Sequence, residues 1–155
     1  MKKVLYDIGG GFKEEIKALQ IGGPLGGVIP IAEAEKLNLD FQEFTTAGFM
    51  LGHASIVSIP KDFPMVEYIH HLFEFTAEES CGKCFPGRLG SYRGKEMFDQ
   101  AVNKTNKIPI KLLNELLITM QKGSLCALCG AIPLPIQNIL KYFTEEFKTD
   151  INQEA

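Results

Sequence analysis

The spacing of hydrophobic residues changes near Pro60. Before this point, short apolar runs such as "KALQIGG" and "ASIVSIP" stand beside glycine and proline, which favours strands. The segments "IGGPLGGVIP" and "TTAGFMLGH" predict loops or tight turns, and we expect short helices within residues 11–16 and at "IAEAEKL". The pattern predicts a small glycine-rich α/β module over residues 1–60.

After Pro60, apolar residues recur every three or four positions, which predicts amphipathic helices. We expect four helices with short connections, and such helices most economically form a bundle. This predicts a helical domain over residues 61–150, followed by a frayed tail at 151–155. The first predicted helix begins near Asp62 and runs to about residues 75–79. The second covers 95–104, the third covers 108–123, and the fourth begins at Pro135.

Charge and hydropathy exclude several classes of partner. The 155 residues carry a formal net charge of −3 with acidic and basic residues well mixed, so no basic stripe indicates nucleic-acid binding. No apolar segment is long enough to suggest a signal peptide or a membrane span. We therefore expect a cytoplasmic protein that binds no nucleic acid and has no membrane span.

The four cysteines form two C-x2-C pairs, Cys81 with Cys84 and Cys126 with Cys129. In a reducing cytoplasm such cysteines are more often free, catalytic or metal-bound than disulfide-linked. Both pairs stand at borders of predicted helices, and in an antiparallel bundle these borders can meet at one end. Four converging thiolates would indicate a structural zinc ion or an iron–sulfur cluster.

Spacing alone does not decide between the two metals. Zinc ribbons separate their pairs by about 15–20 residues, whereas two predicted helices separate the pairs here, which weakens the zinc interpretation without excluding it. The alternative is that the four cysteines are small buried residues that bind no metal.

The stretches "ESCGKCFPGRLG" and "GSLCALCGAIPLPIQNILKYFTEEF", together with "IGGPLGGVIP" and "TAGFMLGHASIVSI", carry a family resemblance. The chain resembles the C-terminal half of the flavoprotein subunit of NADH:quinone oxidoreductase, a half shared by NADH-side subunits of NAD-linked and electron-bifurcating hydrogenases. The resemblance implies an α+β chain: a truncated β-grasp-like (SLBB) module followed by a four-helix bundle that binds a [4Fe–4S] cluster.

The resemblance also implies which cysteines bind the cluster. The family uses C-x2-C-x2-C plus one distant cysteine; Cys81 and Cys84 match the first two ligands and Cys126 the distant one. The third position falls on Gly87, and Cys129 is an additional cysteine. We therefore predict that Cys129 supplies the missing thiolate, so that the ligands are Cys81, Cys84, Cys126 and Cys129. This arrangement also suits [2Fe–2S] or zinc, and the resemblance favours one [4Fe–4S] cluster.

The function implied by the resemblance is electron transfer within an NAD(P)H-linked oxidoreductase of the hydrogenase or NADH dehydrogenase type. The implied partners are a flavin- and NAD-binding subunit and other iron–sulfur subunits. The family's FMN- and NADH-binding domain is not represented in this sequence, so we expect the chain to bind neither FMN nor NAD and not to oxidise NADH alone. An unpaired sheet edge is expected to be covered by another subunit. The alternative is a zinc-clamped assembly subunit without a redox role.

Other polar residues give weaker signals. His70 and His71 are adjacent on a predicted helix and therefore point in different directions, which favours surface positions over a shared metal. Lys83, Arg88 and Arg93 surround the first cysteine pair. They are either solvated charges or charges that offset thiolates and raise the potential of a cluster.

Overall fold

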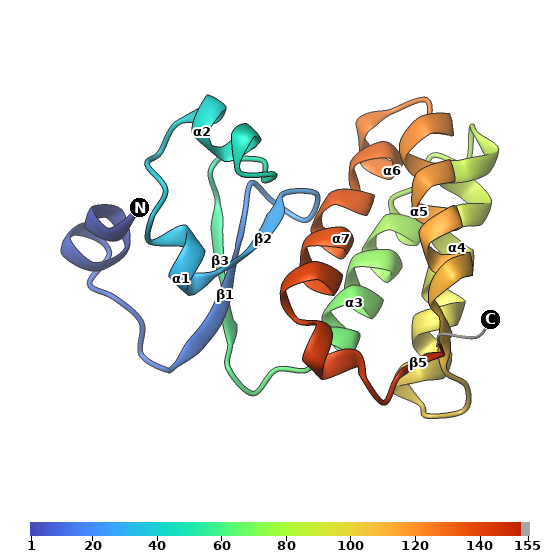
Figure 1. Cartoon of the computed structure of the whole chain (residues 1–155). Helices are drawn as coiled ribbons and strands as arrows, with labels where there is room; N and C mark the ends of the chain where they lie inside the picture. Colours follow the sequence, from blue (N-terminus) through green and yellow to red (C-terminus); the bar gives the residue numbers. More distant parts are fainter. Residues whose placement is uncertain (153–155) are drawn as a thin grey trace. The chain divides into compact units, whose positions relative to one another are not determined.

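The computed structural model describes residues 1–152 and divides into two compact units, Met1–Phe63 and Pro64–Ala155. The α+β architecture expected from the sequence, a small sheet module followed by a helical domain, is confirmed (Figure 1). Among the described residues, no helix combines the length and apolar character needed to cross a membrane.

The first unit is built on a three-stranded antiparallel sheet of order β2-β1-β3. The strands are β1 (Ile16–Ile21), β2 (Gly27–Pro30) and β3 (Ile56–Pro60). The central strand β1 is buried from Ala18 to Ile21, and Phe44 is buried in the same unit. The apolar runs beside turn formers predict β1 and β3 correctly.

Several local predictions for the first unit are wrong. The segment predicted as a loop contains β2, whose residues pair with β1. No helix lies within residues 11–16; instead a π-helical segment, η1 (Lys3–Ile8), precedes them. A short helix α1 (Ile31–Ala34) begins where one is expected, and α2 (Phe41–Thr46) is an additional helix. The Asp40 side chain caps α2 by accepting a hydrogen bond from the Glu43 N–H at 2.8 Å.

The second unit consists mainly of α3 (Met65–Glu78), α4 (Phe85–Val102), α5 (Ile110–Gly123) and α7 (Pro133–Tyr142). In Figure 1 these helices lie side by side, with the α3–α4 turn and the short helix α6 (Ala127–Ala131) at the same end. The apolar face of α3 is buried as the periodicity predicts, and on α5 so are Leu113, Leu117 and Met120. The four-helix arrangement is therefore confirmed.

The extent of α4 and of the C-terminal segment differs from the prediction. Helix α4 begins at Phe85, well before the predicted start at residue 95, and Pro86 occupies its first turn. After α7 come a 3₁₀ turn, η2 (Thr144–Phe147), and a short strand, β5 (Ile151–Asn152), which pairs in parallel with β4 (Ile108–Pro109). Residues 151–152 are thus paired rather than frayed, and 153–155 lie outside the described residues.

Glycines on the buried face of α4 allow neighbouring elements to approach its backbone closely. A methyl group at position 94 would lie 2.1 Å from Cε1 of Phe73 on α3, and one at position 90 would lie 2.9 Å from Cγ of Met120 on α5. Both distances are far below a carbon–carbon contact, which is optimal near 3.5–4.0 Å. The absence of side chains at Gly90 and Gly94 therefore sets the spacing of α3, α4 and α5.

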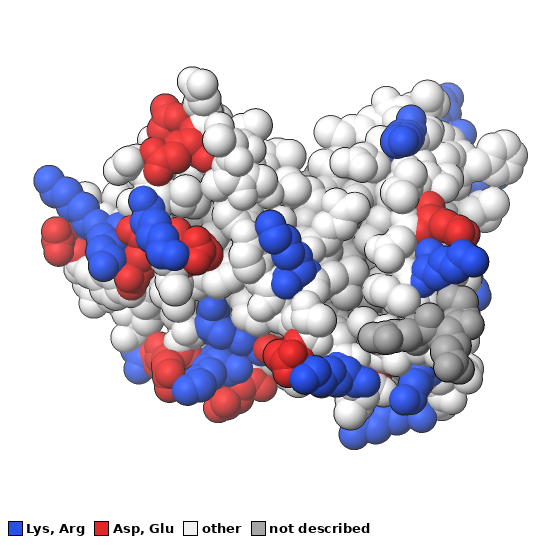
Figure 2. All heavy atoms as spheres, viewed as in Figure 1, with Lys and Arg blue, Asp and Glu red and all other residues white. Residues whose placement is uncertain are grey.

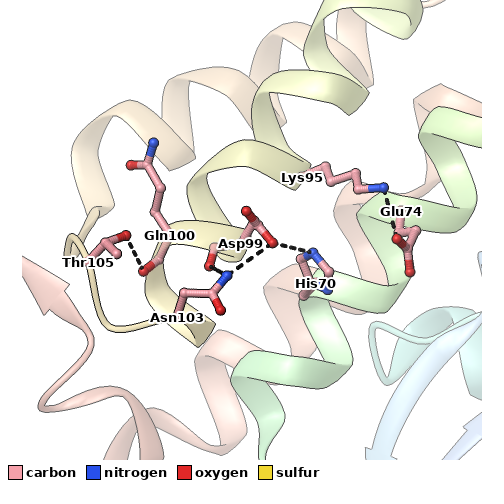
Figure 3. A network of polar contacts seen from close by, with 7 residues as sticks. All are labelled: His70, Glu74, Lys95, Asp99, Gln100, Asn103 and Thr105. Atoms are coloured by element: carbon pink, nitrogen blue, oxygen red, sulfur yellow. Dashed lines mark hydrogen bonds and ion pairs between the residues drawn. The ribbon is translucent and has the colours of Figure 1, made fainter.

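Polar contacts join α3 to the C-terminal half of α4 (Figure 3). Lys95 Nζ lies 2.8 Å from Glu74 Oε1, and His70 Nε2 lies 3.7 Å from Asp99 Oδ1. The Lys95 ammonium lowers the pKa of Glu74, chiefly through this hydrogen bond. His70 is therefore packed between helices rather than fully exposed.

The charged side chains that Figure 2 displays are interspersed in sign. Several form short-range pairs, including Lys61 with Glu15 at 2.8 Å and Arg93 with Glu96 at 3.1 Å. Such exposed pairs contribute little to stability. The burial of apolar side chains contributes more to the stability of the helical unit.

Replacing Gly94 with alanine tests the close approach of α3 and α4. The new methyl group would overlap the Phe73 ring, so we expect Gly94→Ala to lower the free energy of unfolding by about 1–3 kcal/mol, even though alanine favours a helix by about 1 kcal/mol over glycine. Urea denaturation followed by circular dichroism measures this. In a Phe73→Leu background the same substitution should cost less, because the ring that it strikes is gone. Equal costs in both backgrounds would contradict this packing.

Candidate iron–sulfur centre

The four cysteines are placed by two turns at one end of the helical unit. Cys81 is exposed in the turn between α3 and α4, and Cys84 is the residue that precedes the first turn of α4. Cys126 is exposed and precedes α6, whereas Cys129 lies within α6 and is buried. The turn between α3 and α4 includes Gly82, whose backbone adopts a positive φ of 70°.

The sulfurs of Cys84 and Cys129 meet over Gly87. A methyl group built at Gly87 would lie 3.0 Å from each sulfur, so the two sulfurs are no farther apart than twice that distance. Gly87 is itself buried in the first turn of α4. The space next to position 87, three residues after Cys84, is thus filled from outside α4 by the Cys129 side chain.

Backbone amides surround the Cys84 sulfur. Hydrogen bonding to the backbone of Leu125, and next to that of Gly87, lowers the pKa of the Cys84 thiol. The Gly87 amide belongs to the first turn of α4, where N–H groups lack partners within the helix and favour negative charge. Because Leu125 directly precedes Cys126, the Leu125 contact also links the two cysteine turns.

Cys129 has the opposite environment. Burial raises the pKa of its thiol, and the negative charges of Cys126, Cys84 and Cys81 act in the same direction. A hydrogen bond with the Ser80 hydroxyl opposes them; Cys129 Sγ lies 4.0 Å from Ser80 Oγ. The other three cysteines are therefore near enough to Cys129 to influence it electrostatically.

These residues fit a group held by thiolates. The Ser124 Oγ is shielded from solvent and, among the described residues, makes no hydrogen bond of normal geometry, yet it contributes to lowering the pKa of Cys84. A thiolate at Cys84 would give that hydroxyl an acceptor. Across residues 1–152, no group of three or more His, Cys, Asp and Glu side chains is arranged to hold a single metal ion.

The basic residues near the first pair take different positions. Arg88 packs against the ring of Phe85, with Cζ 5.2 Å from the ring centroid, and its Cδ lies 3.7 Å from where a side chain at Gly82 would begin. Arg88 therefore extends along the turn that carries Cys81 and Cys84. Arg93 pairs with Glu96 instead.

Three features of the site are missed by sequence reasoning. Pro86, a residue favoured in a first helical turn, is the available signal that α4 begins at the cysteines. The hydroxyls of Ser80 and Ser124 carry no sequence signal, because an isolated serine beside a cysteine is too common to be informative. Their role is visible only in three dimensions.

Thiol alkylation of the metal-free chain tests these two environments. Since the pKa of Cys84 is lowered and that of Cys129 raised, Cys84 should reach half-maximal iodoacetamide labelling at a lower pH than Cys129. Mass spectrometry of peptides labelled over a pH series from mildly acidic to alkaline gives both profiles. Coinciding profiles, or the reverse order, would contradict the described amide contacts and burial.

Comparison with known proteins places this site in a family. Residues 67–150 match the family model described as the NADH-ubiquinone oxidoreductase-F iron-sulfur binding region. Among curated relatives, the NADP-reducing hydrogenase subunit HndC of Solidesulfovibrio fructosivorans is 29% identical over 157 residues, covering 99% of this chain and 32% of the relative. The F subunit of NADH-quinone oxidoreductase from Escherichia coli (strain K12) is 32% identical over 158 residues, covering 98% and 35%.

A solved structure shares the fold. The crystal structure of NAD+-reducing [NiFe]-hydrogenase in the H2-reduced state matches with a TM-score of 0.82 at 20% identity, covering 97% of this chain and 26% of that chain. The chain spans about a third of the length of the curated relatives that it matches. Because the family model covers more than half of the sequence and includes both cysteine pairs, the chain belongs to the family of NADH-ubiquinone oxidoreductase-F iron-sulfur binding regions.

Proposed function

We propose that this chain forms the iron–sulfur-binding part of a multi-subunit NAD(P)H-linked oxidoreductase and relays single electrons through one [4Fe–4S] cluster. The observation that carries the proposal is the closeness of one sulfur from each cysteine pair: Cys84 and Cys129 share the space over Gly87, and the Leu125 backbone bonds to Cys84. The family description supports an iron–sulfur centre.

We propose Cys81, Cys84, Cys126 and Cys129 as the ligands, one thiolate for each iron. A bound cluster supplies one-electron oxidation and reduction. The chain supplies the thiolates, backbone N–H groups that stabilise negative charge at Cys84, and burial at Cys129. The Cys84 thiol would deprotonate more readily than the Cys129 thiol and so be more readily available to bind, because metal ligands must lose their proton.

The proposed partners are a flavin- and NAD-binding subunit and other iron–sulfur subunits. The relatives named above are subunits of a hydrogenase and of NADH-quinone oxidoreductase, which supports assembly into a complex. Large apolar side chains next to the cysteines are unusually exposed: Phe85 by 69%, Leu89 by 56% and Leu125 by 79%. Exposed apolar residues grouped around a functional site are typical of a surface that another protein covers. We expect the chain alone not to oxidise NADH.

Spectroscopy and metal analysis test the proposed cofactor. Protein purified without oxygen should show broad visible absorption that dithionite bleaches, with iron and acid-labile sulfide in equal amounts. The same preparation from a Cys84→Ser variant should lose most of this iron, because it lacks a proposed ligand whose thiolate form is stabilised by backbone hydrogen bonds. Colourless protein with stoichiometric zinc would instead support the zinc-clamped assembly role and exclude the relay.

Exchanging the residues at positions 87 and 129 tests the ligand set. We expect Cys129→Gly to lose cluster binding, and the double variant Gly87→Cys, Cys129→Gly to recover it, because a side chain at 87 would enter the space that the Cys129 sulfur vacates. Iron content and visible absorption measure both. Full iron in Cys129→Gly would show that Cys129 is not a ligand.

The single Gly87→Cys variant is the matched control for this exchange. It adds a side chain 3.0 Å from two sulfurs that are still present, so crowding should reduce its iron content below that of the double variant. If the single variant binds iron as well as the unmodified chain does, the two positions do not compete for one space.

A further inference from the structure

Two serine hydroxyls lie beside the two sulfurs that share the space over Gly87. The Ser124 Oγ is buried and, within the described part of the chain, lacks a hydrogen bond of normal geometry. Ser124 follows the last turn of α5, and its Cβ lies 3.7 Å from where a side chain at Gly130 would begin, which places it between α5 and α6. The preceding residue, Gly123, lies against the first turn of α4, since a methyl group there would be 2.9 Å from Cγ of Pro86. Ser124 is thus held near the start of α4, where its hydroxyl helps to lower the pKa of the Cys84 thiol.

Ser80 occupies the corresponding place at the other sulfur. Its Oγ lies 4.0 Å from Cys129 Sγ in a partly buried contact, and it also accepts a hydrogen bond from the Gly82 N–H at 3.4 Å. A hydroxyl can accept from a neutral thiol and can donate to a thiolate. In the chain with neutral thiols, Cys129 donates to the Ser80 oxygen. When Cys129 is a thiolate, the Ser80 proton can turn toward the sulfur instead, while the oxygen keeps its bond from the Gly82 amide.

Resting on the proposed function, we propose that Ser80 and Ser124 are positioning residues that donate hydrogen bonds to the ligand sulfurs of Cys129 and Cys84 and thereby raise the reduction potential of the cluster. Reduction adds one electron and increases the negative charge on the sulfurs. A donor held at a sulfur therefore stabilises the reduced state more than the oxidised state. Removing either hydroxyl should lower the potential.

The test uses the iron-loaded full chain and its Ser124→Ala and Ser80→Ala variants. Dithionite titration followed by electron paramagnetic resonance gives the midpoint potential, and metal analysis gives the iron content. Each alanine variant should keep its iron and should favour the oxidised state by roughly tenfold, which for a one-electron couple is about 59 mV toward more negative potential. The double variant should show a larger shift than either single variant.

Two further variants serve as controls. Ser124→Thr keeps a hydroxyl and should keep the potential of the unmodified chain. Ser91→Ala removes another buried hydroxyl, which donates to the Gly87 carbonyl at 2.6 Å rather than to a sulfur, and should leave the potential unchanged. A shift in Ser91→Ala equal to that in Ser124→Ala would show a general packing effect and overturn the proposal.

The remaining outcomes separate this inference from the proposed function. Full iron with unchanged potentials in both alanine variants overturns the hydroxyl role and leaves the relay intact. Loss of iron in both variants makes the hydroxyls necessary for assembly rather than for tuning, which also overturns the inference. An unmodified chain without iron and sulfide overturns the proposed function itself.

Discussion

The closeness of neighbouring elements to the backbone of α4 is the constraint on which the second unit depends. Each of three glycines on one face of this helix is approached closely by a different side chain. Cys129 lies against Gly87, Met120 against Gly90 and Phe73 against Gly94. Their spacing of three and four residues places them along one stripe of the helix. The same stripe therefore packs against the apolar core at one end and against the cysteine sulfurs at the other.

This constraint explains how two distant cysteine pairs meet. Cys84 is fixed because it directly precedes α4, and Gly87 leaves room beside it for a sulfur from α6. The backbone groups that bond to Cys84 come from both turns, through Gly87 and Leu125. The contact of α6 with α4 thus both buries Cys129 and completes the hydrogen bonds of Cys84. The packing of these helices and the chemistry of the thiols are therefore coupled.

The sequence predicts the two-part fold and the helical periodicity, but it misplaces the start of α4. Gly87, Gly90 and Gly94 each disfavour an isolated helix by about 1 kcal/mol relative to alanine, so local propensity delays the predicted start to residue 95. Tertiary packing overrides that preference, because the absent side chains are what permit contact with Phe73 and Met120. The paired cysteines identify the candidate site for a different reason. The C-x2-C spacing indicates thiols that bind one metal centre, and this indication does not depend on predicting the local helices correctly.

The two ends of α4 are held by different forces, and this bears on how the chain responds to its proposed cofactor. At the far end, Phe73 packs against Gly94, and Lys95 and Asp99 contact Glu74 and His70 of α3. At the near end, the contacts converge on sulfurs whose charge depends on whether a metal is bound. Metal binding adds its free energy to the folded state as a whole, but the contacts it makes lie only at the near end. The far-end contacts are made by protein groups alone, whereas the near end gains its full set of partners when the thiolates are bound.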